Sequence, residues 1–90
     1  MGYSLEIPKH LDRIFLKLAK RDRKQLKAIH AKITQILEHP HHFKPLRGDL
    51  KGARRVHIHS SFVLLYEIDE KNRVVRLLNY DHHDVIYEKQ

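Results

Sequence analysis

The chain has 90 residues, of which 41% are hydrophobic and 32% are charged, which predicts one soluble globular domain with one core and excludes a disordered chain. Lysine and arginine outnumber aspartate and glutamate by 18 to 11, the formal net charge is +7, and nine histidines add positive charge below about pH 6.5. This charge favours nucleic acid, an acidic membrane surface or an acidic protein as the partner. The absence of cysteine excludes a disulfide framework and a thiolate nucleophile. No apolar run is long enough for a membrane span, so we expect a cytoplasmic protein without a membrane partner.

The N-terminal half predicts a strand followed by two helices. Apolar residues alternate over residues 3–7, which indicates a short strand, and Pro8 stands where a helix can begin. Apolar residues then recur at helical spacing as far as about Lys20. Asp22 and Gln25 have the spacing of a capping box, so a second helix is expected to follow directly and to fold back on the first.

The second helix is predicted to end at Glu38 or His39, because Pro40 disfavours a helical residue before it. Beyond a loop over residues 40–52, alternating and apolar patterns predict strands over residues 53–59, 62–68 and 73–81, a polar hairpin connection at 69–72, and a short helix or ordered tail at 82–87. The whole chain, residues 1–90, is therefore predicted to be a single α+β domain. It has an N-terminal strand, an antiparallel two-helix hairpin and a three-stranded antiparallel meander, with the helices packed on one face of the sheet and the other face open.

The predicted strand at residues 53–59 carries the residues best suited to chemistry. Side chains alternate along a strand, so Arg55, His57 and His59 are expected on one face and the apolar residues between them on the other. Imidazole accepts and donates protons near neutral pH, so His57, together with His83 near the C-terminus, is a candidate general base or acid at a phosphodiester. The alternative is that these histidines simply decorate a solvated sheet face.

Further cations in this half of the chain can hold phosphate: Lys44, Arg47, Lys51 and Arg54. If RNA is the substrate, its own 2′-hydroxyl is the nucleophile, so the site needs no metal and no cofactor. The competing interpretation is a zinc site formed by His57, His59 and either a third histidine or Asp81. Tyr87 follows His83 by one helical turn, where it can stack on a base, share in proton transfer, or hold the tail against the core.

Four segments together resemble the RelE/ParE superfamily of toxins from toxin–antitoxin systems. They are KPLRGDLKG at residues 44–52, RRVHIH at 54–59, FVLLYEID at 62–69 and HDVIY at 83–87. Members of the superfamily typically show a Pro-Leu-x-Gly-x-Leu-Lys-Gly-x-x-Arg-x-Arg segment, a strand of the form YRVIYEI, and a closing tail of the form His-Arg-x-x-Val-Tyr. The predicted order of strand, helix hairpin and sheet also agrees, so the resemblance covers nearly the whole chain.

This resemblance implies a toxin of a type II toxin–antitoxin system, of the RelE/YafQ-like kind: an endoribonuclease, or mRNA interferase, that cleaves mRNA in the ribosomal A site and contacts ribosomal RNA. It implies a cognate antitoxin that wraps the basic surface, and no small-molecule cofactor or metal. The catalytic residues it implies are Arg55, His57, His83 and Tyr87. The residues that we expect to bind RNA or phosphate are Lys44, Arg47, Lys51, Arg54, His59 and His82.

The chain departs from the superfamily pattern at two positions. Val63 stands where many RelE-like members have arginine in the central strand, and the basic position beside His83 is taken by His82 or Asp84. The missing arginine removes one phosphate contact, which favours a mechanism centred on histidine or a weakened enzyme. Two alternatives stay open: a ParE-like gyrase inhibitor, which needs no catalytic site, and a basic nucleic-acid-binding module without catalysis.

Overall fold

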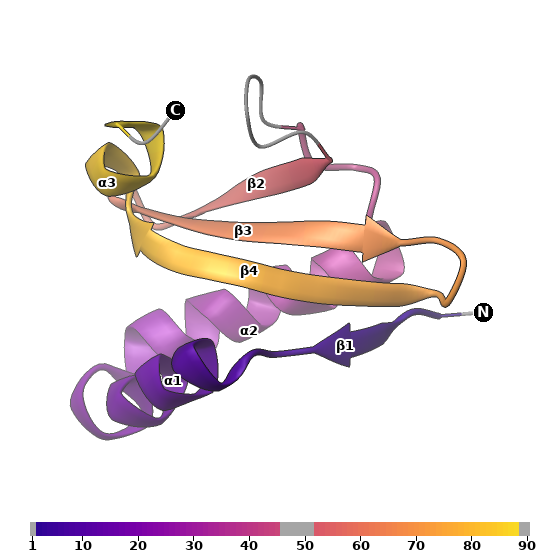
Figure 1. The fold of residues 1–90 in the computed structure, drawn as a ribbon. Coiled ribbons are helices and arrows are strands. Elements are labelled where there is room, and N and C mark those ends of the chain that lie inside the picture. The colour runs from indigo at the N-terminus through magenta and orange to yellow at the C-terminus, as the bar shows by residue number, and fades with distance from the viewer. Residues whose placement is uncertain (1, 46–51, 89–90) are drawn as a thin grey trace.

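The computed structural model describes residues 2–45 and 52–88. In chain order its elements are β1 (Ser4–Glu6), α1 (Lys9–Arg21), α2 (Arg23–Glu38), β2 (Ala53–Ile58), β3 (Phe62–Asp69), β4 (Val74–His82) and α3 (His83–Glu88). Figure 1 shows one sheet with α1 and α2 on one side and the short α3 on the other. The predicted α+β fold, with both long helices on one face, is confirmed, and each predicted element lies within one residue of its observed bounds.

The helix hairpin turns on a single residue, Asp22. Its backbone N–H donates to the carbonyl of Leu18 (2.8 Å) and ends α1, while its carboxylate accepts from the backbone N–H and the side-chain amide of Gln25, both at 3.1 Å. The carboxylate thereby satisfies a donor that the first turn of α2 leaves without an intrahelical partner. The predicted cap is confirmed, and it explains how two helices reverse direction with one residue between them.

The sheet has the strand order β1-β4-β3-β2. Strands β2, β3 and β4 form the predicted antiparallel meander, and β1 pairs with β4 in the parallel direction, with Leu5 opposite Val75. In the sequence, α1, α2, β2 and β3 therefore all lie between β1 and β4, which are neighbours in the sheet. As a result β2 is an edge strand, and the basic residues that it carries lie at a border of the sheet.

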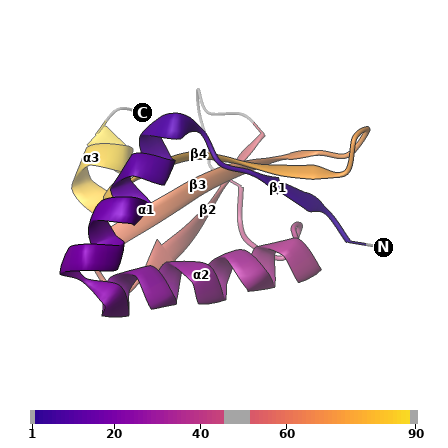
Figure 2. The ribbon, with the colours of Figure 1, turned by 90° about the horizontal axis from the view of Figure 1, so that it is seen from below.

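The main core lies between the sheet and the helix hairpin; Figure 2 shows the molecule from the helix side, with α1 and α2 in front of the sheet. Its buried members are Leu11, Phe15, Ile29, Ile33, Ile36, Val56, Ile58, Leu64, Tyr66, Val75, Leu77 and Tyr80. The two tyrosines bury their rings and keep a partner for the hydroxyl: Tyr66 donates to the carbonyl of Pro40 (2.5 Å) and Tyr80 donates to the side chain of Gln25. Both rings therefore contribute to the core without leaving a buried hydroxyl unpaired.

A β-bulge changes which residues of β4 face the core. Against β3 the register moves from Tyr66 paired with Leu77 to Leu65 paired with Asn79, so Leu78 is the extra residue. Strict alternation would place Tyr80 opposite to Leu77, yet both belong to the main core. The bulge thus brings an aromatic ring into the core and turns Asn79 to the other face.

The face of the sheet opposite the long helices is not open along its whole length. A second buried cluster lies there, formed by Ala53, Val63, Leu65 and Ile86, with Leu78 packed against it. Ile86 belongs to α3, so this short helix is held on the sheet by apolar contact. The expectation of an open face is wrong for this end of the sheet, and the consequence is that the residues at the start of α3 have a fixed position beside β2 and β3.

Candidate active site

His57 lies on the edge strand β2, on the same face as α3. The neighbouring residues Val56 and Ile58 are buried in the main core, so alternation along the strand turns Arg55 and His57 to the other side. The side chain of Arg55 is half-buried and that of His57 is exposed. The predicted sharing of a face by Arg55 and His57 is confirmed.

His83 is brought to His57 by the turn from β4 into α3. Its backbone N–H donates to the carbonyl of Ser61 at 2.7 Å, which ties the start of α3 to the turn between β2 and β3. The imidazoles of His57 and His83 stack with their centroids 5.7 Å apart and their planes inclined by 30°. Two candidate proton-transfer groups that are 26 positions apart in the sequence therefore form one pair.

The electrostatics of the pair favour a neutral His57. Although His57 is exposed overall, its partial burial lowers its pKa below the ordinary value, and the nearby charges of His83 and Arg55 lower that pKa further. His83 has a carboxylate within reach, since Asp84 Oδ1 lies 3.5 Å from Nδ1 of His83. His57 is thus held in the neutral form that a general base needs before it reacts, and His83 lies beside a carboxylate.

His59 and His82 take different positions from the pair. The strand β2 ends at Ile58, and His59 lies in the following turn with φ of 54°, so the prediction that His59 shares the strand face of Arg55 and His57 is wrong. The ring of His82 lies 4.3 Å from that of Phe62, which in turn stacks on Tyr80 of the main core. A shallow pocket of about 270 Å³ lined by Ser60, Ser61, His82, His83 and Asp84 connects this side to the histidine pair.

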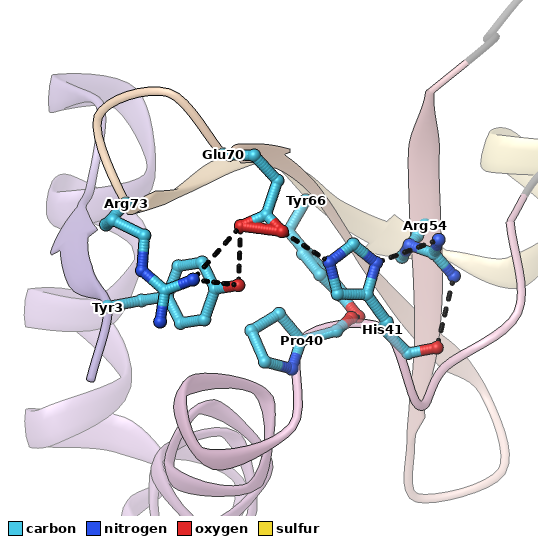
Figure 3. A network of polar contacts seen from close by, with 7 residues as sticks. All are labelled: Tyr3, Pro40, His41, Arg54, Tyr66, Glu70 and Arg73. Carbon is cyan, nitrogen blue, oxygen red and sulfur yellow. Dashed lines mark hydrogen bonds and ion pairs between the residues drawn. The ribbon is translucent and has the colours of Figure 1, made fainter. Parts of the chain in front are cut away.

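Arg54 is not part of the cationic row of Arg55 and His57. It donates to the carbonyl of Phe43 (2.6 Å) and lies 3.4 Å from both the carbonyl and Nδ1 of His41. The other nitrogen of His41 is 2.9 Å from the carboxylate of Glu70, so a chain of polar contacts joins β2, the segment after α2 and the β3–β4 connection (Figure 3). The guanidinium of Arg54 is engaged by the protein itself.

Three predicted site residues cannot be placed. Arg47 and Lys51 lie outside the described residues, and so does the side chain of Tyr87, although its backbone belongs to α3. Their proposed roles stay predictions. Lys44 is described and exposed, and its carbonyl accepts from the backbone N–H of Arg55 at 3.1 Å, so it lies directly beside the edge strand.

The structure adds one cation to the site that the sequence did not indicate. A groove of about 520 Å³ at the β2 edge is lined by Lys32, His42, Phe43, Lys44, Arg55, Val56 and His57. Lys32 belongs to α2 and is half-buried, whereas Lys24 and Lys27 on the same helix are exposed. The feature of the sequence that could have indicated Lys32 is its position three residues after Ile29, at the border of the apolar stripe of α2.

Arg76 also lies on the α3 side of the sheet, but it is surrounded by carboxylates. It pairs with Glu6 (2.8 Å), Glu67 (2.7 Å) and Asp69 (3.5 Å). These contacts raise the pKa of Arg76, and the hydrogen bond to Glu6 is the largest cause. These contacts neutralise that end of the face. The positive charge of the site is therefore concentrated at the end that holds Arg55 and the histidine pair.

Among the described residues, the structure contains no ligand set for the alternative zinc site. Among residues 2–45 and 52–88, no group of three or more histidine, aspartate or glutamate side chains is arranged to hold a metal ion. His59 lies in a turn, and not on the strand face that it would share with His57 in the predicted zinc site.

Among residues 2–45 and 52–88, no helix combines the length and the apolar character that a bilayer span requires.

Comparison with known proteins identifies the family. The family model described as "ParE toxin of type II toxin-antitoxin system, parDE" matches residues 3–87. A relative from Methanocaldococcus jannaschii named "Putative toxin RelE4" is 50% identical over 88 residues, which covers 98% of this chain and 94% of the relative. An uncharacterized protein of Methanosarcina mazei is 51% identical over 85 residues, 94% of this chain and 99% of the relative. The chain belongs to the ParE toxin family, within the RelE/ParE superfamily of type II toxin–antitoxin toxins.

Solved structures agree with this assignment. The toxin–antitoxin complex RelBE2 of Mycobacterium tuberculosis contains a chain that is 27% identical, with a TM-score of 0.72 and coverage of 92% of this chain and 100% of that one. A mutant of the Escherichia coli toxin RelE in its free state is 25% identical, with a TM-score of 0.72 and coverage of 98% and 93%. YafQ from Escherichia coli shares the fold at 16% identity, with a TM-score of 0.71 and coverage of 94% and 98%.

Proposed function

We propose that this toxin is a ribosome-dependent mRNA endoribonuclease in which His57 is the general base and His83 the general acid. The observation that carries the proposal is the stacking of these two imidazoles, 5.7 Å between centroids, beside Arg55 on one face of the sheet. The similarity to chains named RelE supports the same class of activity. The resulting site combines proton transfer with cationic charge and requires no cofactor.

The reaction is a transesterification within the RNA. His57 takes the proton of a 2′-hydroxyl, and the oxygen attacks the adjacent phosphorus while the bond to the 5′-oxygen breaks. His83 gives its proton to that leaving oxygen. The products are a 2′,3′-cyclic phosphate and a free 5′-hydroxyl, so all atoms and protons balance. Arg55 stabilises the added negative charge on the phosphate in the transition state.

The assignment of base and acid follows from the environment of each ring. A base must be neutral before the reaction, and the lowered pKa of His57 keeps its imidazole neutral near pH 7. The acid must carry a proton when the leaving oxygen departs, and we assign this role to His83, the other ring of the stacked pair. Lys44, Arg47 and Lys51 would contact mRNA or ribosomal RNA, and Tyr87 would stack on a base or assist proton transfer.

A cognate antitoxin would neutralise the toxin by covering this basic surface. Related chains have been solved as toxin–antitoxin complexes, namely RelBE2 and DinJ-YafQ. A net charge of +7 favours an acidic or amphipathic segment as the inhibitor.

A second candidate is gyrase inhibition of the ParE kind, which the description of the matching family favours. An inhibitor that acts by binding alone has no need of paired proton-transfer groups. The two functions therefore differ in their dependence on His57 and His83.

The test is cleavage of a defined mRNA in a reconstituted translation system, with the cut ends mapped by primer extension. The wild-type chain is expected to cut translated message in phase with codons, and His57→Ala or His83→Ala to lose about 10²- to 10⁴-fold in rate. His10→Ala is the matched control, because His10 is an exposed histidine of α1, and should keep full activity. Cuts that do not depend on either histidine would refute the assignment. Absence of cuts together with inhibition of gyrase supercoiling would establish the second candidate instead.

A further inference from the structure

The groove at the β2 edge joins the helix layer to the histidine pair. It begins at Lys32 on α2, passes Phe43 and Lys44 in the segment after that helix, and reaches Arg55 and His57 on β2. We call it the β2-edge groove. Figure 2 shows α2 running along this side of the sheet, and α2 and β2 are in contact. One end of the groove is thus the proposed general base.

The edge position of β2 explains why a groove forms here. The carbonyl of Lys44 accepts from the N–H of Arg55, and Pro45 forms an isolated bridge with Arg54, so these two residues lie along the first part of the strand. The helix α2 is in contact with β2. Lys32 comes three residues after Ile29 and four before Ile36, both fully buried, so it stands at the margin of the buried stripe and lines the groove.

The charge of the groove has one sign. Of the described residues that line it, none is acidic. Within the described part of the chain, neither Lys32 nor Lys44 forms an ion pair with a carboxylate. Together with Arg55 these lysines present cationic groups from three separate segments to one space. Such an arrangement follows an extended anionic chain better than a single small anion.

The segment that carries Lys44 is fixed from behind. Tyr66, fully buried, donates to the carbonyl of Pro40, and Arg54 donates to the carbonyl of Phe43. Figure 3 shows Tyr66 and Pro40 beside the polar contacts that run from Glu70 through His41 to Arg54. Ordering of the groove therefore costs little when a ligand binds. Arg54 acts here as a positioning residue, through the backbone that leads to Lys44.

We propose that the β2-edge groove binds the phosphodiester backbone of single-stranded RNA next to the scissile phosphate, with Lys32 as a binding residue. The proposal rests on the proposed ribonuclease function, because it treats the His57 end as the reacting end. RNA is favoured over an acidic peptide by this continuity with His57 and by the rings of His42 and Phe43 in the lining, which offer stacking surfaces to bases.

The test measures binding of a fluorescent single-stranded oligonucleotide of about ten nucleotides, with 2′-O-methyl sugars so that it cannot be cut. Lys32→Ala is expected to weaken binding roughly fivefold at low salt and to lower the slope of log Kd against log salt concentration by about 0.7, the value for one phosphate contact. Lys27→Ala is the matched control: it removes the same charge from an exposed position of the same helix and should leave the slope unchanged. Lys32→Arg keeps the charge and should retain the wild-type slope, so a folding defect in the alanine variant does not mask the result.

Three outcomes of these binding measurements test the assignment of the β2-edge groove independently of the cleavage assay. Equal losses in the Lys32 and Lys27 variants would mean a general field effect and would overturn the groove assignment. Binding of polyglutamate that depends on Lys32, with RNA binding that does not, would assign the groove to a protein partner and would also overturn it. RNA binding that depends on Lys32 in a chain that cuts no RNA would support the groove while refuting the proposed reaction.

Discussion

The imidazole of His57 has a lowered pKa because three causes act in the same direction. Partial burial disfavours the cation, and the charges of His83 and Arg55 repel it. The ordinary pKa of histidine is about 6.5, so His57 is neutral over a wider range than an isolated histidine. A base with this property stays competent when the solution becomes mildly acidic.

NMR titration of the His57 ring tests this explanation. In the wild-type chain the midpoint should lie below about pH 6.5, and His83→Ala should raise it, because that variant removes a repelling charge and exposes the ring. The acidic limb of kcat/KM, which reports the free enzyme's base, should lie at the same pH as the His57 midpoint. A midpoint at or above about 6.5, or one that His83→Ala leaves unchanged, would show that burial and the charge of His83 do not set the pKa of His57.

The contact between Tyr66 and Pro40 holds the segment that leads to the β2-edge groove. Burial raises the pKa of Tyr66 to about 12, so the hydroxyl keeps its proton and donates at any physiological pH. The acceptor belongs to Pro40, which is itself buried. Removal of the hydroxyl would leave that carbonyl without this donor.

Tyr66→Phe is therefore expected to lower the free energy of unfolding by about 1 to 2 kcal/mol, measured by urea denaturation. Tyr3→Phe is the matched control, because it removes only exposed hydrogen bonds, the one to Glu70 (2.5 Å) and the one from Arg73 (3.1 Å), and is expected to lower the free energy of unfolding much less. Equal losses of unfolding free energy in the two variants would mean that burial of the Pro40 carbonyl does not determine the destabilisation by Tyr66→Phe.

Among the helices and strands, α3 is the element that completes the site. It has six residues, too few to be stable as a helix on its own. Its position depends on Ile86 in the second buried cluster and on the hydrogen bond from His83 to Ser61. The helix that presents His83 is therefore held by tertiary contact.

Ile86→Ala should loosen α3 from the sheet. The loss of a buried isoleucine side chain costs about 2 kcal/mol or more, and the amide of His83 is expected to exchange with solvent faster, with a loss of RNA cleavage. Val85→Ala, at a half-exposed position of the same helix, is the control. It should change the amide exchange at His83 and the RNA cleavage much less. Unchanged exchange at His83 in Ile86→Ala would show that α3 does not depend on this contact.

Across the chain as a whole, local patterns predicted the elements and their order well. The Asp22 cap and the stripe through Ile29 and Ile36 depend on residues that are close in sequence, and both are observed. The parallel pairing of β1 with β4 joins the two ends of the chain, with Ser4 opposite Val74, and no local pattern carries a signal for such a pairing.

The candidate site was predicted only in part, because local patterns do not show which distant residues the packing brings together. Strict alternation correctly placed Arg55 and His57 on one face. It did not place Arg54, which serves the segment after α2, or His59, which falls beyond the strand end. Lys32 has a helical neighbourhood typical of a solvated lysine, and only the packing of α2 against β2 brings it to the groove.

The catalytic assignment of His57 and His83 is best tested by mapping cellular mRNA ends during induced expression of the chain, beside the His57→Ala and His83→Ala variants. We predict codon-phased cuts in translated messages with the wild type, and none with either variant at equal levels of folded protein. Growth arrest without such cuts, or cuts that persist in both variants, would contradict the assignment of the His57 and His83 pair as the catalytic site.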